Sequence, residues 1–219
     1  MLREPMRRLA PISLLSLSAL LSITAGCAGS GDAPTTTSSS ETTSATVDPA
    51  LAGLLLDPHD LPAGFSTSTQ VDDTVTTFCA AEDAAAGLRA TGRAVRGFTN
   101  TASGASVIQL AFRFQGNGAH RFVTQAADAL DRCQGVPDLN GLAFEYDALT
   151  PDLAALLDEA GSAVGRHGVN VGSGSLAINV VVLQQGDIGE LVAVLGVDLP
   201  RRELDALAHT AISAAVSKL

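Results

Sequence analysis

The sequence predicts an α+β domain in which an antiparallel β-sheet is packed by helices. Several segments alternate apolar and polar residues with period two, and short turn-rich stretches join them, as in β-hairpins. Longer segments instead carry an apolar stripe at helical spacing. No regular strand–helix–strand alternation runs through the chain, which argues against a parallel sheet. The patterned stretch covers roughly 170 residues, enough for a single domain with its own core.

The clearest strand signal is a hairpin in the middle of the chain. Residues 95–100 and 106–115 flank the turn sequence Thr-Ala-Ser-Gly at 101–104. Ile108, Leu110, Phe112 and Phe114 alternate with Val107, Gln109, Ala111 and Arg113. The four alternating apolar residues are therefore expected on one face of a strand, packed against the covered side of the sheet.

The other elements follow from changes of period and from Gly and Pro positions. Helices are expected at 49–56, 118–133, 151–160 and 199–219, and strands at 66–77, 144–149, 164–171, 176–183 and 190–197. The last helix places Leu204, Leu207, Ala211 and Ile212 on one apolar face, which we also expect on the sheet's covered side.

The first residues have the pattern of a secretory signal. Arg3, Arg7 and Arg8 precede the apolar run 12–23, which is too short to span a bilayer. The run ends in Thr24-Ala25-Gly26-Cys27, which resembles the lipobox of bacterial lipoproteins, although Thr24 stands where that motif usually has Leu. The resemblance implies that 1–26 is a signal peptide, that Cys27 carries lipid, and that the protein sits on the extracytoplasmic face of the cell membrane. The alternative is an ordinary signal cleaved near Ala25, with Cys27 left as a free thiol.

A polar tract separates this signal from the domain. Residues 27–48 are rich in Thr and Ser and contain almost nothing apolar, so they predict a disordered stalk. The folded domain is expected at 49–219. The stalk is either a bare linker or a site of O-glycosylation.

Two cysteines remain if Cys27 is acylated. In an oxidising compartment Cys79 and Cys133 are expected to form a disulfide, the alternative being two buried free thiols. On the chain-entropy model a link across this loop contributes about 3–4 kcal/mol.

The charge balance restricts the partners. Without the three arginines and one glutamate of 1–26, the chain has 10 basic and 22 acidic residues, a net charge of −12. Such a domain is a poor candidate for binding nucleic acid or an anionic lipid surface.

The folded part resembles known envelope proteins. The segment 54–65, Leu-Leu-Leu-Asp-Pro-His-Asp-Leu-Pro-Ala-Gly-Phe, looks like the opening of many actinobacterial envelope lipoproteins, and twelve Arg against the single Lys218 resembles the residue usage of high-GC actinobacteria. The cysteine at a helix end, the antiparallel strands and the Ala-rich last helix are similar to the PknH-type extracellular sensor domain. Mog1/PsbP-like lipoproteins are the second choice. The resemblance implies a helix-covered sheet and a ligand-binding groove, although this chain offers one disulfide where the sensor family typically has two.

No residue set with catalytic or metal-binding spacing stands out. His59, His120, His167 and His209 lack the spacing of convergent metal ligands, so we expect solvated or partly buried histidines, with neither metal nor cofactor. The stretch 172–176 does not match a nucleophile elbow and predicts a hairpin turn. Gly116-Asn117-Gly118 lacks the lysine of a phosphate loop.

Two groups of charged residues are less specific. The acids are expected to form a solvated surface, with sugar or calcium binding as the alternative: Asp72, Asp73, Glu145, Asp147, Asp152, Asp158 and Glu159. Five arginines line an anion-binding groove or form a solvated face: Arg89, Arg93, Arg96, Arg113 and Arg121. Arg89 and Arg93 are expected at the surface.

The leading functional hypothesis is a non-enzymatic envelope lipoprotein. Its sensor-like domain is expected to bind a small amphiphilic ligand or an envelope protein. The alternatives are a structural or interaction protein without a ligand cavity, and a hydrolase with dispersed catalytic residues.

Overall fold

The computed structural model describes residues 48–69, 77–78, 82–85, 87–132, 137–138, 142–172 and 175–219. The signal peptide, Cys27 and the stalk before Asp48 lie outside these residues, as do Cys79 and Cys133. The predictions of lipidation and of a disulfide therefore stay predictions.

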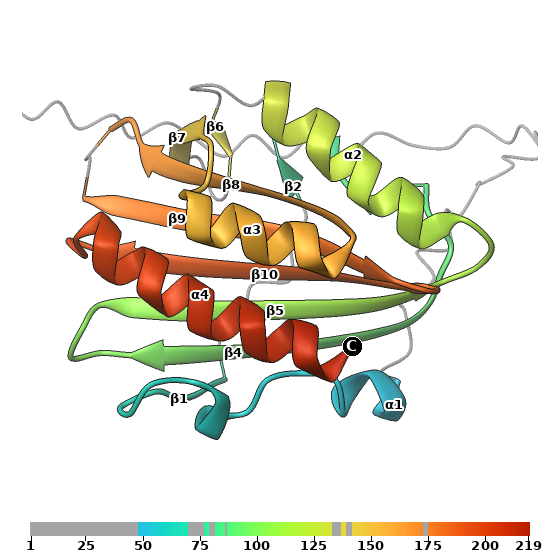
Figure 1. The fold of residues 1–219 in the computed structure, drawn as a ribbon, viewed down its shortest axis with the longest axis horizontal. Coiled ribbons are helices and arrows are strands. Elements are labelled where there is room, and N and C mark those ends of the chain that lie inside the picture. Colours follow the sequence, from blue (N-terminus) through green and yellow to red (C-terminus); the bar gives the residue numbers. More distant parts are fainter. Residues whose placement is uncertain are drawn as a thin grey trace, which may run out of the picture. The chain divides into compact units, whose positions relative to one another are not determined.

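Eight of the strands in the described ranges form one sheet (Figure 1). Across the sheet they are β1 (Ser66–Ser68), β4 (Ala90–Asn100), β5 (Ala105–Phe114), β10 (Ile188–Val197), β9 (Leu176–Gln185), β8 (Ser162–Asn170), β7 (Leu142–Asp147) and β6 (Pro137–Asp138). Each neighbouring pair is antiparallel. β2 (Thr77–Phe78) and β3 (Glu82–Asp83) pair separately. The predicted antiparallel α+β architecture is confirmed.

The helices begin close to where the sequence places them. They are α1 (Pro49–Ala52), the 3-10 helix η1 (Pro58–Asp60), α2 (Gly118–Arg132), α3 (Pro151–Ala160) and α4 (Arg201–Lys218). α1 is shorter than the expected helix 49–56, because the chain turns at Gly53 and the Asp57 side chain then caps η1. The expected strand 66–77 is described only as β1 and the last residue, Thr77, which lies in β2. No helix in the described ranges is long and apolar enough to cross a membrane.

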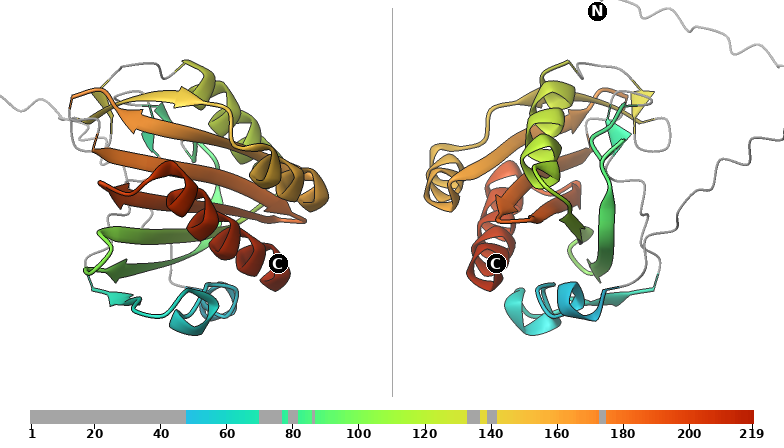
Figure 2. Two further views of the ribbon diagram at one scale, coloured as in Figure 1. Left: turned by 60° about the vertical axis from the view of Figure 1, so that its left-hand side comes forward. Right: turned by 90° about the vertical axis from the view of Figure 1, so that its right-hand side faces the viewer.

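The two faces of the sheet are covered by different helices. α2 contacts β5, β8, β9 and β10, whereas α3 and α4 contact each other and pack on β8, β9 and β10. Figure 2 shows α2 apart from the α3–α4 pair. Leu110, Phe112 and Phe114 join the α2 side of the core, while Leu204, Leu207 and Ile212 join the α4 side. The expectation that β5 and the last helix share one covered side is therefore wrong. Helices cover both faces because the central strands carry apolar side chains on each face of the sheet.

A cluster of three aromatic rings fills the space between β5 and α2. The ring centroids of Phe112 and Phe114 are 5.7 Å apart, and each lies 5.5 Å from that of Phe122. Gly118 allows α2 to start this close to the strand, because a Cβ there would lie 2.6 Å from Cβ of Phe114. The backbone of residue 118 is thus fitted to the aromatic cluster.

Residues 48–65, which we call the N-terminal strap, are held against the sheet by polar contacts from three other segments. The Leu56 N–H donates to Gln109 Oε1 at 2.5 Å, and Arg96 Nη1 donates to the Leu56 carbonyl at 2.6 Å. Lys218 Nζ, near the end of α4, lies 2.8 Å from the Asp60 carboxylate. Asp48 starts the strap by capping α1 and by pairing with Arg113 at 3.3 Å.

Beneath the strap lies a buried carboxyl group. Glu190 on β10 is fully buried, and its Oε1 accepts a hydrogen bond from Gln109 Nε2. Its Oε2 has no hydrogen-bond partner among the described residues. Burial raises the pKa of Glu190 to about 7, although the hydrogen bond from Gln109 acts in the opposite direction.

Candidate functional site

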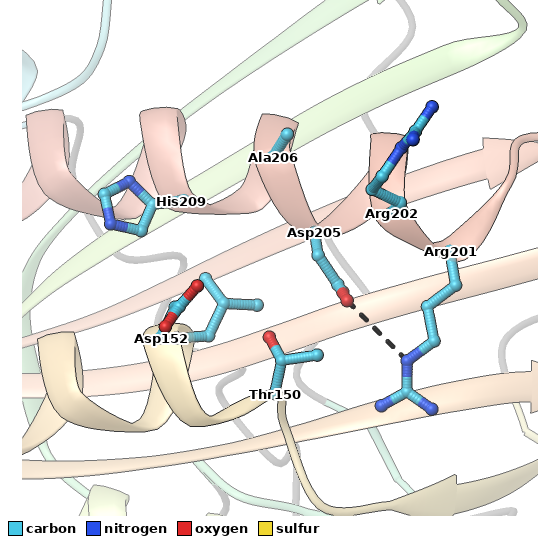
Figure 3. A pocket seen from close by; sticks show the side chains of 8 residues that line it. Thr150, Asp152, Arg201, Arg202, Asp205, Ala206 and His209 are labelled. Carbon is cyan, nitrogen blue, oxygen red and sulfur yellow. Dashed lines mark ion pairs between the residues drawn. The ribbon is translucent and has the colours of Figure 1, made fainter.

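A pocket of about 540 Å³ lies between the start of α3 and the first half of α4 (Figure 3). It is lined by Thr150, Asp152 and Leu153 at the start of α3 and by Arg201, Arg202, Asp205, Ala206 and His209 on α4. The two helices start at the same end of the sheet and lie side by side, so residues about fifty positions apart in the chain meet there (Figures 1 and 3).

Local sequence fixes where these helices begin and how they sit. Pro151 occupies the first turn of α3 and Pro200 is the residue before α4, positions where a missing N–H costs nothing. Leu153 and Leu204 are buried and anchor the two first turns to the sheet. Arg201 Nη2 donates to the Ala148 carbonyl at 3.2 Å, which ties α4 to the loop before α3. The pocket is therefore built on fixed elements.

One carboxylate of the pocket belongs to a polar network that runs into the core. Asn179 Nδ2 donates to Asp205 Oδ1 at 2.9 Å, and Arg201 Nε lies 3.6 Å from the other Asp205 oxygen. Because its amide nitrogen faces Asp205, Asn179 presents Oδ1 to His167, whose Nδ1 donates to it at 2.9 Å. Asn179 and His167 are buried, so this network links the pocket wall to β9 and β8.

Three other ionisable side chains of the pocket have no polar partner among the described residues. Arg202, Asp152 and His209 are exposed, and their side chains form neither an ion pair nor a hydrogen bond within the part of the chain that the structure describes. The pocket thus offers a guanidinium, a carboxylate and an imidazole to a molecule from outside.

The position of the two arginines is electrostatically unfavourable for the helix itself. A helix N-terminus carries partial positive charge, and a cation there is destabilising by about 0.3–1 kcal/mol. Arg201 and Arg202 both lie in the first turn of α4, where the acidic Glu203 offsets part of this effect. Only Arg201 has a carboxylate partner among the described residues, Asp205. An anionic group beside Arg202 would relieve this repulsion.

The four histidines are not brought together. His59 lies in η1, His120 is exposed on α2, and His209 lines the pocket. His167 is 2 % exposed, which is more buried than the expected solvated or partly buried state, because Asn179 satisfies its ring nitrogen inside the sheet. Within the described ranges no three His, Cys, Asp or Glu residues are grouped as metal ligands.

The five candidate arginines do not share one groove. Arg96 binds the strap, Arg113 pairs with Asp48 and Asp187, and Arg89 and Arg121 are exposed. Arg93 was expected at the surface, but it is half-buried, with its guanidinium carbon 5.7 Å from the Phe112 ring centroid. That correction follows from the alternation of β4, which turns Arg93 toward its register partner Phe112.

The candidate acids are mostly dispersed on the surface. Asp152 lines the pocket, whereas Glu145, Asp147, Asp158 and Glu159 are exposed on β7 and α3. Asp72 and Asp73 lie outside the described residues.

Most of the pocket was not anticipated from the sequence. The sequence pattern does not indicate Thr150, Leu153, Arg201, Arg202, Asp205 and Ala206 as site residues, and for His209 it predicts only a solvated or partly buried side chain. One signal was available: two consecutive arginines at the predicted start of a helix, where a cation is disfavoured.

Comparisons with known proteins give similarity in structure only. The crystal structure of the extracellular domain of PknH from Mycobacterium tuberculosis matches with 15% identity and a TM-score of 0.49, over 77% of this chain and 95% of that one. A point mutant of the protein Mog1 matches with 11% identity and a TM-score of 0.31, over 72% of this chain and 80% of that one. No protein-family model matches the chain, and no curated protein matches it significantly.

Proposed function

We propose that this protein is a lipid-anchored extracytoplasmic protein whose non-enzymatic domain binds a small ligand in the α3–α4 pocket. The observation that carries the proposal is the set of uncommitted side chains, Arg202, Asp152 and His209, around one pocket. The export pattern of 1–26 and the lipobox-like position of Cys27 support the location. An envelope protein remains the alternative occupant of the same site.

The chemistry of the pocket suits recognition. Its charged groups stand on two helices that pack against each other, so the backbone positions from which these side chains extend are fixed without a ligand. Asp205, the most enclosed carboxylate, is held by Asn179 and Arg201 and serves to fix the wall. The buried acid with a raised pKa, Glu190, does not line the pocket and plays no part in this proposal.

Filling the pocket is expected to remove the ligand. Ala206 lies on the pocket wall, and a tryptophan there would occupy the space. If a small molecule stays bound when the protein is purified in detergent from the organism that produces it naturally, Ala206→Trp should lose that molecule. Native mass spectrometry measures the bound mass. The matched control is Ala155→Trp, an exposed alanine of α3 outside the pocket, which should keep it. Absence of any bound mass from the unmodified protein, or equal retention by both variants, contradicts ligand binding at this site.

Removing the cysteine of the lipobox-like motif is expected to release the protein from the membrane. Cys27→Ala lacks the thiol that accepts the lipid, so the protein should move from the membrane fraction to the soluble fraction and no longer incorporate labelled palmitate. A variant that stays in the membrane fraction and still takes up palmitate shows that the anchor is elsewhere.

A further inference from the structure

The pocket has two charged ends, and this arrangement indicates the class of ligand if the proposed function holds. Figure 3 shows Arg201 and Arg202 at one end and Asp152 with His209 toward the other. Arg202 and His209 are seven residues apart on α4, which corresponds to about two turns and roughly 10 Å along the helix axis.

Between these two ends, the described lining residues offer no charged side chain that lacks a partner. Asp205 lies between the two ends but is paired with Arg201 and hydrogen-bonded to Asn179. Ala206 and Leu153 supply the apolar wall there, and the small side chain of Ala206 leaves room beside the helix. A ligand that spans the pocket therefore meets a cation, an apolar stretch and an acceptor in that order.

We propose that the pocket takes an elongated zwitterion, with its anionic group at Arg202 and its ammonium at Asp152, at the end of the pocket where His209 also lies. The anionic group also lies at the positive end of α4, where the helix dipole favours it. The imidazole of His209 offers a second polar contact near the ammonium end.

The uncommitted charges disfavour other ligand classes. A purely anionic ligand leaves Asp152 without a partner, and a purely cationic ligand leaves Arg202 without one. An aliphatic acid satisfies Arg202 but places hydrocarbon against the carboxylate of Asp152.

Tri-alanine is a suitable probe, because three extended residues span at most about 10–11 Å between their charged termini. Equilibrium dialysis of the lipidated protein in detergent, at low salt and neutral pH, compares tri-alanine with N-acetyl-tri-alanine, tri-alanine amide and decanoate. Tri-alanine is expected to bind at least about tenfold more tightly than either blocked peptide, since each blocked form loses one charge-assisted contact.

Single variants assign each end of the probe. Arg202→Ala should abolish the preference for a free carboxylate, and Asp152→Asn should abolish the preference for a free ammonium. The matched controls are Arg121→Ala and Asp158→Asn, exposed residues of α2 and α3 outside the pocket, which should leave both preferences unchanged.

The outcomes separate this inference from the proposed function. If decanoate binds in a manner blocked by Ala206→Trp while tri-alanine does not, the zwitterion is wrong and the ligand pocket stands. If tri-alanine binds equally to the blocked forms, or equally to Arg202→Ala, the assignment of the two ends is wrong. If no probe binds and no co-purifying mass is found, both proposals fail.

Discussion

Replacing Phe112 with alanine is expected to lower the free energy of unfolding by about 3–5 kcal/mol. Phe112 is 6 % exposed and stands between Phe114 and Phe122, so the truncation removes two ring contacts and opens a cavity under α2. The neighbouring backbone cannot close that cavity easily, because α2 is fitted to the strand at Gly118. Urea unfolding of the purified protein measures the effect.

Two arginine variants test whether the inside and outside of β4 are assigned correctly. Arg89→Ala alters an exposed side chain and should change the unfolding free energy by no more than about 0.5 kcal/mol. Arg93→Ala should cost more than Arg89→Ala, since Arg93 is half-buried over the Phe112 ring. A mild Phe112→Ala variant beside a strongly destabilised Arg89→Ala variant would mean that the two faces are reversed.

The buried Glu190 is expected to make the domain less stable as the pH rises. Its pKa is about 7 in the folded protein, against 4.5 for an unperturbed glutamate carboxyl, so the folded state holds the proton more tightly. The stabilisation is fully present below pH 4.5 and is lost as the pH rises through 7. The difference corresponds to about 3 kcal/mol between the two limits.

Glu190→Gln isolates this contribution from the other titrating groups. The amide cannot ionise and keeps an oxygen that accepts from Gln109, so the variant should be more stable than the unmodified protein at pH 8 but not at pH 4. Thermal or urea unfolding across this range gives the difference at each pH. Glu145→Gln, which changes an exposed glutamate of β7, should follow the unmodified protein throughout. If the difference in unfolding free energy between Glu190→Gln and the unmodified protein does not vary with pH, the pKa of Glu190 is not raised in the folded state.

The elements with strong periodicity were predicted closely. The helix expected at 151–160 is α3 with the same limits, and the helix expected at 118–133 is described as Gly118–Arg132. The hairpin around 101–104 is formed by β4 and β5. In these segments the local pattern and the tertiary packing agree, because each has one clear apolar face.

The order of the strands was not predicted, and neither was the covering of the sheet by helices on both faces. β10 lies between β5 and β9, so the first half of the chain pairs with its last strand. In residues 178–183 and 191–194 the side chains on both faces of the strand are buried. A continuous buried run of this kind does not show which strands will pair with it. The strap was likewise misjudged at 49–56, because its contacts with Gln109, Arg96 and Lys218 come from three distant segments.

By itself the sequence determined the α+β class, the position of most helices and strands, and the expectation of export with lipid on Cys27. These conclusions depend on periodicity, charge and short motifs, which are properties of neighbouring residues. The pocket was decided only by tertiary structure, because residues 150–153 and 201–209 meet through the packing of α3 beside α4 on one face of the sheet. Tertiary structure also decides which side chains there have polar partners. Asn179 and Arg201 hold Asp205, while Arg202 and Asp152 stay available to a ligand.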